Sequence, residues 1–218
     1  MRSSFALKTY FLEPTSENLL KCASFLKEGE VVALPTETVY GLAADAFCVS
    51  AVAKVFKAKR RPLIKPLICN ISSLDMFYRL SFIGSKLLRV VFEKFWPGPL
   101  TVVVPKKSYV SNLVTAGGYT VAIRFSSNPI LKKITDIVGS PLVIPSANIS
   151  GHGSCVDAFS VYNELKFKVQ AVVNGGVSEI GKESTIIFLQ GHNVKILRLG
   201  AITKECLKKG LKDAIFVD

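Results

Sequence analysis

The chain has 218 residues, of which 49% are hydrophobic, and its 28 Lys and Arg against 16 Asp and Glu give a formal net charge of +12. This size suffices for one sizeable buried core, and no linker, repeat or low-complexity segment divides residues 1–218, so we expect a single domain. The positive charge favours anionic partners such as nucleotides, RNA or acidic lipid head groups. No apolar run approaches the roughly 18 residues that span a bilayer, and the N-terminus is a poor signal peptide, which predicts a soluble, cytoplasmic protein without a membrane role.

The cysteine and histidine pattern argues against a metal site. The cysteines are odd in number, widely spaced and without a C-x-x-C pair, which indicates a reducing compartment. The chain also lacks the GxxxxGK[ST], GxGxxG, HExxH and G-x-S-x-G motifs, so the phosphate-loop, dinucleotide, zinc-protease and hydrolase classes lack support. We expect the cysteines to be small buried residues and the histidines to be exposed in turns beside glycines (Cys22, Cys48, Cys69, Cys155, Cys206; His152, His192).

The N-terminal part predicts a helix followed by a strand. The helix is expected from Ser16, a good N-cap, to Gly29, a residue typical of helix C-termini. The β-rich run Val31–Leu34 predicts a strand that breaks at Pro35. The turn that follows is rich in small and hydroxylated residues as far as Gly41, so it offers backbone donors and hydroxyl groups to a ligand.

A second helix, capped by Ser50, is predicted to end before Pro62 in a crowd of cations (Lys54, Lys57, Lys59, Arg60 and Arg61, with Lys65 beyond). A strand end with free N–H groups near clustered Lys and Arg is what binding a polyphosphate requires. The alternative is that these cations complement the helix macrodipole and otherwise face solvent. The six cations together with the turn at 35–41 favour a binding site, with Lys59 and Arg61 exposed at the helix end.

The rest of the chain alternates strands with helices and then forms a hairpin. Strands are predicted at 66–71, 100–105, 120–125, 142–144, 169–174, 184–188, 194–199 and 214–217, and helices at about 73–95, from 129, at 157–165 and from about 203. Residues 108–118 are expected to be an irregular, polar loop, the best candidate for a mobile segment over a cleft. The pattern predicts an α/β fold with a twisted, mixed sheet flanked by helices.

Two arginines stand in otherwise apolar strands, Arg124 in VAIRF and Arg198 in ILRLG. A guanidinium at such a position is costly unless it is paired. Ligands of open α/β sheets bind at the ends of strands, so both arginines are candidate ligand-binding residues. The alternative is a salt bridge to a carboxylate such as Glu37 or Asp45.

The run PTETVYGLAADAF followed by KAKRRP-x-x-KPL resembles the signature of the YrdC/TsaC family, the threonylcarbamoyl-AMP synthases. The resemblance continues, in the family's order, through WPGPLTVVVP, VAIRF, PLVIPSANISG, ESTII and ILRLG. It covers nearly the whole chain and implies the family's open sheet and central cleft. Because the chain stops soon after ILRLG, we expect the additional C-terminal domain of longer family members to be absent.

The resemblance implies a reaction in which L-threonine, bicarbonate and ATP give threonylcarbamoyl-AMP and pyrophosphate, for the threonylcarbamoyl modification of an adenosine in tRNA. The implied partners are these three substrates, with tRNA and downstream threonylcarbamoyl-transfer proteins as further partners. By motif, ATP is held by Lys57, Lys59, Arg61, Thr120, Ser146, Asn148, Ser184 and Arg198. Threonine and its carbamate lie against Thr36, Tyr40, Lys65 and Arg124.

No general acid or base is assigned, because cations and backbone donors that neutralise phosphates can supply most of the catalysis by positioning and electrostatics. Mg²⁺ is expected to accompany ATP, held mainly by phosphate oxygens and with no protein ligand assigned. Two alternatives remain. One is a non-catalytic RNA-binding module, and the other is carbamoyl transfer as in the related HypF domain.

Overall fold

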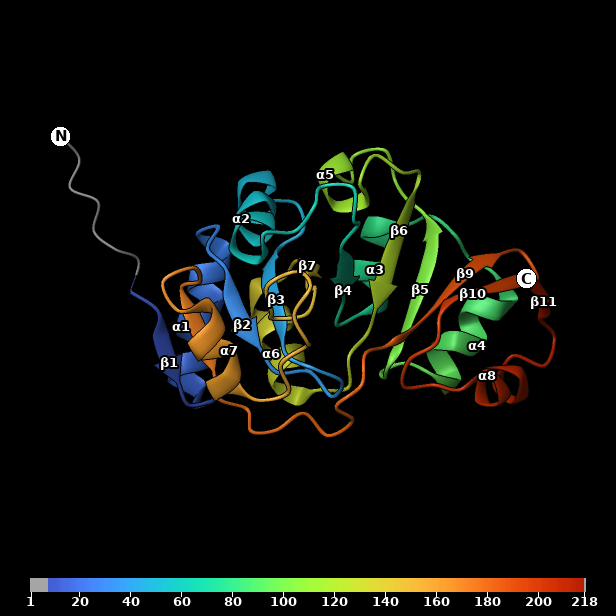
Figure 1. Ribbon diagram of the computed structural model, residues 1–218. Coiled ribbons are helices and arrows are strands. Elements are labelled where there is room, and N and C mark those ends of the chain that lie inside the picture. The colour runs from blue at the N-terminus through green and yellow to red at the C-terminus, as the bar shows by residue number, and fades with distance from the viewer. Residues whose placement is uncertain (1–7, 218) are drawn as a thin grey trace.

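The computed structural model describes residues 8–217. In this part of the chain eleven strands form one sheet in the order β1-β8-β2-β3-β7-β4-β6-β5-β9-β10-β11 (Figure 1). The strands are β1 (Tyr10–Leu12), β2 (Val32–Leu34), β3 (Gly41–Asp45), β4 (Ile68–Asn70), β5 (Leu100–Pro105), β6 (Thr120–Arg124), β7 (Leu142–Val143), β8 (Ala171–Val173), β9 (Thr185–Gln190), β10 (Asn193–Arg198) and β11 (Ile215–Val217). The helices are α1 (Ser16–Lys27), α2 (Val49–Lys59), α3 (Leu74–Leu80), α4 (Lys86–Lys94), α5 (Asn112–Thr115), α6 (Pro129–Val138), α7 (Ala158–Leu165) and α8 (Lys204–Gly210).

The sheet is open and mixed. Its first and last strands, β1 and β11, lie at opposite ends of the molecule in Figure 1. Parallel pairs such as β2 with β8 and β5 with β9 are interspersed with antiparallel pairs such as β2 with β3 and β5 with β6. This arrangement confirms the predicted α/β fold with an open mixed sheet flanked by helices.

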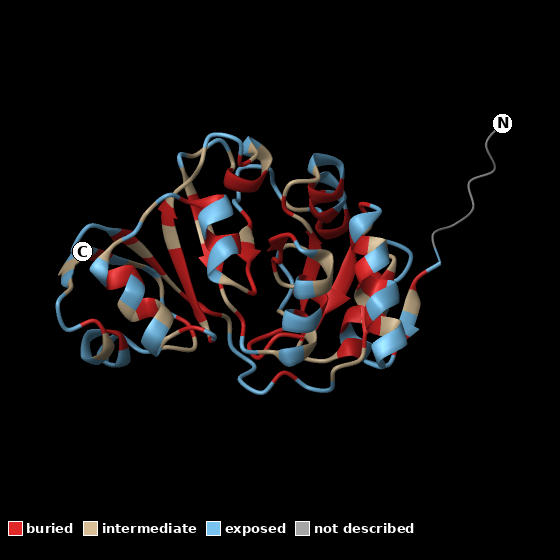
Figure 2. Cartoon of the chain, turned by 180° about the vertical axis from the view of Figure 1, so that it is seen from behind, coloured by how far each residue is buried: buried red, intermediate tan, exposed pale blue. Residues whose placement is uncertain are grey.

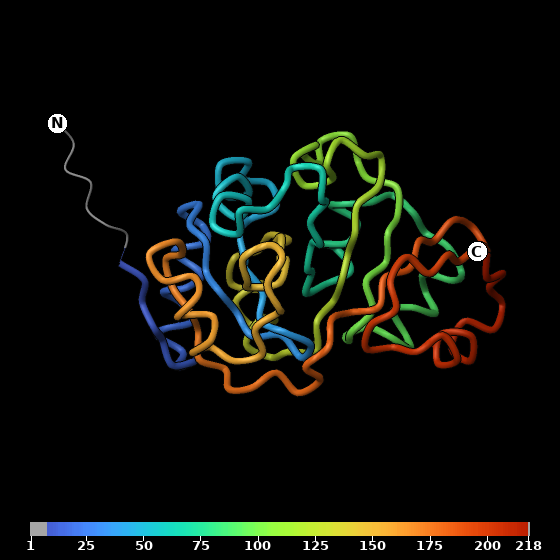
Figure 3. Tube along the Cα trace, in the orientation of Figure 1, coloured from blue at the N-terminus to red at the C-terminus, as the bar shows by residue number. Residues whose placement is uncertain are grey.

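Segments far apart in the sequence meet at one edge of the sheet. Strand β8 pairs in parallel with both β1 and β2, with Ala171 opposite Tyr10 on one side and Val32 on the other. Figure 3 shows this late segment, in orange, beside the blue N-terminal segments. The edge therefore forms only when the C-terminal half of the chain packs onto the N-terminal part.

Side chains on the strands alternate between two helical layers. On β2, Val32 and Leu34 pack in a core cluster with α1 and α6, whereas Ala33 packs in the larger cluster that includes α2 and α7. On β8, Val172 likewise faces the opposite side from its two neighbours. The period of two along a strand produces this alternation. Figure 2 shows the result, with buried strands between helices whose outer surfaces are exposed.

The N-terminal caps of α1 and α2 differ from the prediction by one or two residues. Thr15, not Ser16, caps α1, and its hydroxyl accepts a hydrogen bond from Asn18 N at 3.2 Å. Helix α2 follows Cys48, which makes no side-chain cap hydrogen bond, so Ser50 lies inside the first turn. Short strand β3 was not predicted at all, because its small residues lack a β-rich signature.

Two longer segments also differ. The predicted helix at 73–95 is two helices, α3 and α4, and Ser81 between them donates to Pro105 O at 2.7 Å. The predicted irregular loop at 108–118 contains α5, and Leu67 N donates to Val114 O at 2.8 Å. Val114 is fully buried, so this segment packs onto the core and is not an irregular polar stretch.

The five cysteines are all free, but only Cys22, Cys69 and Cys155 are buried as predicted. Cys48 is half-buried and Cys206 is exposed, while both histidines are exposed as expected. None of the helices in residues 8–217 combines the length and the apolar character needed to cross a membrane.

Candidate active site

A cavity of about 360 Å³ lies where the turn between β2 and β3, the end of β7 and strands β4, β6, β9 and β10 meet. Its size falls within the range of about 300 to 1,000 Å³ that is usual for small-molecule sites. Four cations line it, namely Arg61, Lys65, Arg124 and Arg198. Among the described residues of the wall, Glu183 is the one carboxylate. The cavity is therefore suited to an anionic ligand.

The turn after β2 is organised by the hydroxyl of Thr36. This hydroxyl donates to Val39 O at 2.7 Å and accepts from Thr38 N at 3.1 Å and Val39 N at 3.2 Å. It also lies 2.8 Å from the Thr38 hydroxyl. The donor and the acceptor positions of the Thr36 hydroxyl are thus all used within the turn, which fixes the wall that Thr36, Thr38 and Val39 present to the cavity.

The second strand-to-turn corner follows β7 and lies against the first. Gly41 and Ser146 form a bridge between the two corners, and Leu42 N donates to Pro145 O at 2.8 Å. A Cβ atom at Gly41 would overlap the side chain of Ile144, so the close approach requires glycine. The Ser146 hydroxyl donates to Asn148 Oδ1 at 2.6 Å, which orders the corner.

Lys59 supports this second corner from behind. Its ammonium group donates to Ser146 O, to Asn148 O at 2.7 Å and to Asn148 Oδ1 at 3.2 Å. The side chain is buried, with 1% of its surface exposed, so the prediction of an exposed lysine is wrong. Burial, followed by the charge of Arg61, lowers the pKa of Lys59 to about 8. Lys59 and Asn148 lie behind Ser146 and are not part of the cavity wall.

Arg61 lies in the loop that follows α2 and lines the cavity. Its guanidinium donates to Pro66 O at 2.8 Å and to Lys65 O at 3.2 Å, so the loop that carries Lys65 wraps around it. Arg61 is half-buried, whereas Lys65 is exposed. The two cations enter the cavity wall together because this loop holds them there.

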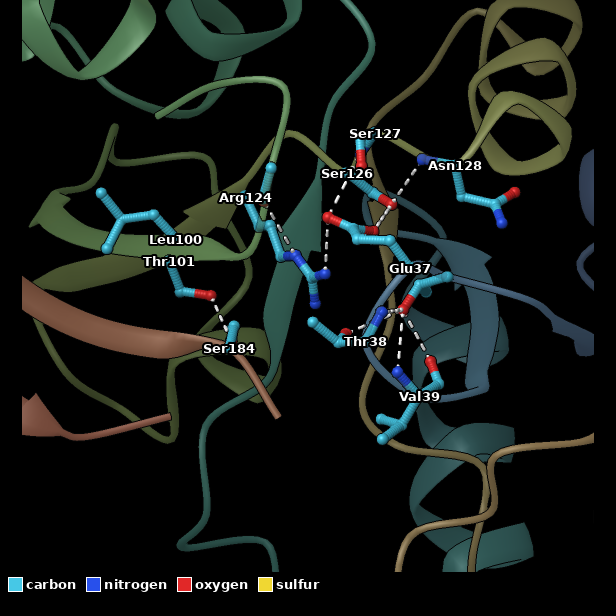
Figure 4. A network of polar contacts seen from close by, with 12 residues as sticks. Glu37, Thr38, Val39, Leu100, Thr101, Arg124, Ser126, Ser127, Asn128 and Ser184 are labelled. Carbon is cyan, nitrogen blue, oxygen red and sulfur yellow. Dashed lines mark hydrogen bonds and ion pairs between the residues drawn. The ribbon is translucent and has the colours of Figure 1, made fainter. Parts of the chain in front are cut away.

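Arg124 projects from β6 into the cavity wall and is paired with Glu37 (Figure 4). This is the salt bridge that the sequence offered as the alternative interpretation, and Arg124 nevertheless also lines the cavity. Burial alone raises the pKa of Glu37, but the charge of Arg124 and the hydrogen bond from Ser126 outweigh it and lower that pKa below its usual value. Asp45, the other carboxylate considered, instead accepts hydrogen bonds from Phe47 N and the Ser140 hydroxyl.

Arg198 and Ser184 form the wall on the β9–β10 side. Arg198 pairs with Glu183 and donates to Ser184 O at 2.9 Å and to the Ser184 hydroxyl at 3.3 Å. The Ser184 hydroxyl lies 2.8 Å from that of Thr101 (Figure 4). Arg198 is about two-fifths exposed, so its guanidinium remains accessible from the cavity.

The structure brings most of the predicted site residues together. Seven of the twelve line the cavity, namely Thr36, Lys65, Arg124, Arg61, Ser146, Ser184 and Arg198. Three do not belong to this site or to its immediate support. Lys57 lines a different cavity. Tyr40 is fully buried, and its hydroxyl bonds to Gly175 N and Gly176 O. Thr120 begins β6, two residues before the wall residue Ala122.

Sequence reasoning missed several members of the site. Glu183 was not assigned, although its place directly before Ser184 was a signal for a counter-charge to Arg198. Ser126 and Thr101 carried no signal, because their roles arise from contacts across the sheet. The apolar part of the wall was also missed, since these side chains read as ordinary core positions (Ile68, Val103, Ala122, Ile144, Ile186, Leu197).

Known proteins are similar to this chain in sequence and in fold. A family model, Sua5_yciO_yrdC, described as "Telomere recombination", matches residues 24–200. Threonylcarbamoyl-AMP synthase from Pyrococcus abyssi is 40% identical over 187 residues, which are 86% of this chain and 55% of that relative. Threonylcarbamoyl-AMP synthase from Bacillus subtilis is 37% identical over 222 residues, covering 94% of this chain and 64% of the relative.

A solved structure of P. abyssi Sua5 complexed with L-threonine superposes with a TM-score of 0.90 at 35% identity, covering 96% of this chain and 62% of that chain. This chain therefore spans between 55% and 64% of the length of these relatives. The family model covers well over half of the 218 residues, and the cavity is built from the motifs that the sequence shares with that family. The chain belongs to the Sua5/YciO/YrdC family.

Proposed function

We propose that this chain forms L-threonylcarbamoyl-AMP and pyrophosphate from L-threonine, bicarbonate and ATP. The single observation that carries the proposal is the cavity in which four cations meet two strand-to-turn corners. The relatives named threonylcarbamoyl-AMP synthase and the Sua5 structure with bound L-threonine support the same reaction. The product would serve the threonylcarbamoyl modification of tRNA.

The chemistry asks for charge neutralisation and positioning. Threonine and bicarbonate give the carbamate and water, and a carbamate oxygen then attacks the α-phosphorus of ATP while the bond to pyrophosphate breaks. Because two anions must approach each other, fixed cations and hydroxyl donors in a cavity lower the barrier without a dedicated acid or base. We assign phosphate binding to Arg61, Ser146, Ser184 and Arg198, and the threonine carbamate to Thr36, Lys65 and Arg124.

Mg²⁺ enters this proposal as part of the nucleotide substrate. Within the described residues no group of three or more His, Cys, Asp and Glu side chains is placed to hold a metal ion. Glu183, the carboxylate in the described wall, is already paired with Arg198. The protein residues do not fit a metal cage, so the phosphate oxygens of ATP would carry the ion.

The test is a pyrophosphate-release assay in which each substrate is omitted in turn. Release is expected only when ATP, bicarbonate and threonine are all present, and a lower rate is expected when serine replaces threonine. Arg61→Ala should lower kcat/KM by about 10² to 10³ if the guanidinium stabilises the phosphates. Lys209→Ala, an exposed lysine in the last turn of α8, is the matched control and should behave as the unaltered protein.

The two alternatives predict different results. An RNA-binding module would release no pyrophosphate and would bind RNA with an affinity that falls steeply as salt rises. A carbamoyl transferase of the HypF type would not depend on threonine. ATP-dependent pyrophosphate release without threonine, or full activity in Arg61→Ala, would contradict the proposed assignment.

A further inference from the structure

The cations at the end of α2 divide between two cavities. Lys59 and Arg61 point toward the candidate active site, one behind its wall and one in it. Lys57 and Arg60 line a second cavity of about 550 Å³, which we call the outer cavity. Lys54, Lys168, Glu30 and Phe167 also line it, and it shares no lining residue with the active-site cavity.

The charges of the outer cavity are only partly balanced. Lys54 pairs with Glu30 at 2.6 Å and donates to Gly29 O at 2.9 Å, and Lys168 donates to Glu164 O at 3.0 Å. No hydrogen bond or ion pair involves the side chain of Lys57 or Arg60 within the described residues. The Arg60 guanidinium and the Lys57 ammonium group lie in one cavity whose described carboxylate, Glu30, already pairs with Lys54, so the cavity favours an anionic ligand.

These two cations are not needed to end the helix. Backbone donors satisfy three of the last carbonyls of α2, because Arg60 N donates to Lys57 O at 3.2 Å, Arg61 N to Phe56 O at 2.9 Å and Ser150 N to Lys59 O at 2.8 Å. The cap position has φ 50°, a left-handed conformation in which glycine is preferred. Arginine at that position costs about 1 kcal/mol or more in conformational energy compared with glycine, and this cost points to a use for its side chain.

Phe167, which also lines the outer cavity, likewise has a left-handed backbone. Its φ is 66°, and 64% of its surface is exposed. Its backbone is held in place, since Phe167 N donates to Thr9 Oγ1 at 2.9 Å and that hydroxyl donates to Val169 O at 2.6 Å. No other aromatic ring in residues 8–217 stacks on it. An exposed ring on an ordered backbone, in the same cavity as Lys57 and Arg60, offers a stacking surface for a planar base.

We propose that the outer cavity binds a nucleotide, with its phosphates on Lys57 and Arg60 and its base against Phe167. Its volume lies within the usual range for small-molecule sites. The inference is separate from the reaction proposed above, because it rests on different side chains and a different cavity.

The experiment uses a local fluorescent reporter, Phe167→Trp, titrated with ADP. The single native tryptophan, Trp96, is buried, and the same titration of the unaltered protein provides its background. We expect ADP to quench the reporter saturably and tripolyphosphate to compete. Phe159→Trp is the matched control, because Phe159 is similarly exposed at 68% but does not line the outer cavity, and it should not be quenched.

Two variants in the reporter background test the cations. Lys57→Gln and Arg60→Gly should each weaken ADP binding about tenfold, the effect of losing one charge-assisted hydrogen bond. Arg60→Gly should at the same time raise the unfolding temperature, because glycine tolerates the left-handed backbone. Unchanged affinity in both variants, or no quenching by ADP, overturns the proposal. Quenching by single-stranded RNA but not by ADP overturns it as well, in favour of an RNA contact.

Discussion

The Arg124 guanidinium lies 2.9 Å from the Glu37 carboxylate at the wall of the active-site cavity, and both side chains are buried, with 7% and 4% exposed. Glu37 also accepts hydrogen bonds from the Ser126 hydroxyl and from Ser127 N (Figure 4). Arg124 donates in addition to Gly98 O at 3.4 Å. The pair therefore presents Arg124 to the cavity in one orientation, and its charge is largely balanced before any ligand arrives.

Glu37→Gln should destabilise the protein strongly. Removal of one partner leaves a buried guanidinium without its counter-charge, which costs on the order of 3 kcal/mol of unfolding free energy. Urea denaturation measures this loss. Asp136→Asn, which removes an exposed i,i+4 pair with Lys132, is the control and should cost less than about 0.5 kcal/mol. A Glu37→Gln variant as stable as this control would show that the pair contributes nothing to stability.

The same carboxylate should make the protein sensitive to acid. The pKa of Glu37 in the folded protein lies below its usual value of 4.5, so the folded state binds fewer protons than the unfolded state in this region. The contribution of Glu37 is present above about pH 4.5 and is lost as the pH falls through the lowered pKa. Denaturation midpoints measured from pH 6 downward should fall, and the fall should be smaller in Glu37→Gln. Parallel curves would contradict this.

At alkaline pH, titration of Lys59 should raise the stability of the protein and lower its activity. The pKa of Lys59 is lowered from 10.5 to about 8, so between these values the folded state has released a proton that the unfolded state retains. The Lys59 contribution to unfolding free energy therefore rises with pH across this window. Pyrophosphate release should fall as the pH rises through about 8, because the neutral amine donates two hydrogen bonds where the ammonium donates three to the corner at Ser146 and Asn148.

Comparison with Lys59→Met isolates this effect. The variant should lack the activity step near pH 8 and should have a kcat/KM already lowered by about 10² or more. It should also lose about 1 to 3 kcal/mol of stability at neutral pH, because three acceptors, two of them buried, lose their donor. An activity step that persists in the variant would assign the titration to another group.

Tyr40→Phe distinguishes a structural role from a threonine contact. The Tyr40 hydroxyl donates to Gly176 O at 2.7 Å and accepts from Gly175 N at 3.0 Å. Its removal takes away two part-buried hydrogen bonds, so we expect a loss of about 1 kcal/mol in urea denaturation with little change in the KM for threonine. A raised KM with unchanged stability would instead place the hydroxyl at the substrate.

The α/β class and the two corners could be predicted from local patterns. The β-rich run Val31–Leu34 and the run Leu100–Pro105 are strands as expected, and Pro35 and Pro145 follow strands at the two corners that line one cavity. Local patterns did not predict the boundaries of elements that depend on contacts with distant parts of the chain. The division of the segment at 73–95 into α3 and α4 depends on a hydrogen bond from Ser81 to a distant strand.

The helical spacing of the sequence indicated that Lys59 is buried, but the charge of the side chain suggested exposure to solvent. Lys59 lies seven residues after Val52, four after Val55 and three after Phe56, and all three are on the buried face of α2. Helical spacing thus places Lys59 in the core, while the charge alone suggests solvent. Lys57, two residues earlier, lies on a different face and lines the outer cavity.

The sequence by itself determined the fold class, the family and the residue types that a polyanion site requires. Only the tertiary structure decided which of these groups meet, since Glu37 reaches Arg124 and Lys59 reaches Asn148 across nearly ninety residues of chain. Local propensity acts over a few residues, whereas these partners depend on the order of strands in the sheet. That order follows from the burial of apolar side chains from distant segments in two shared cores.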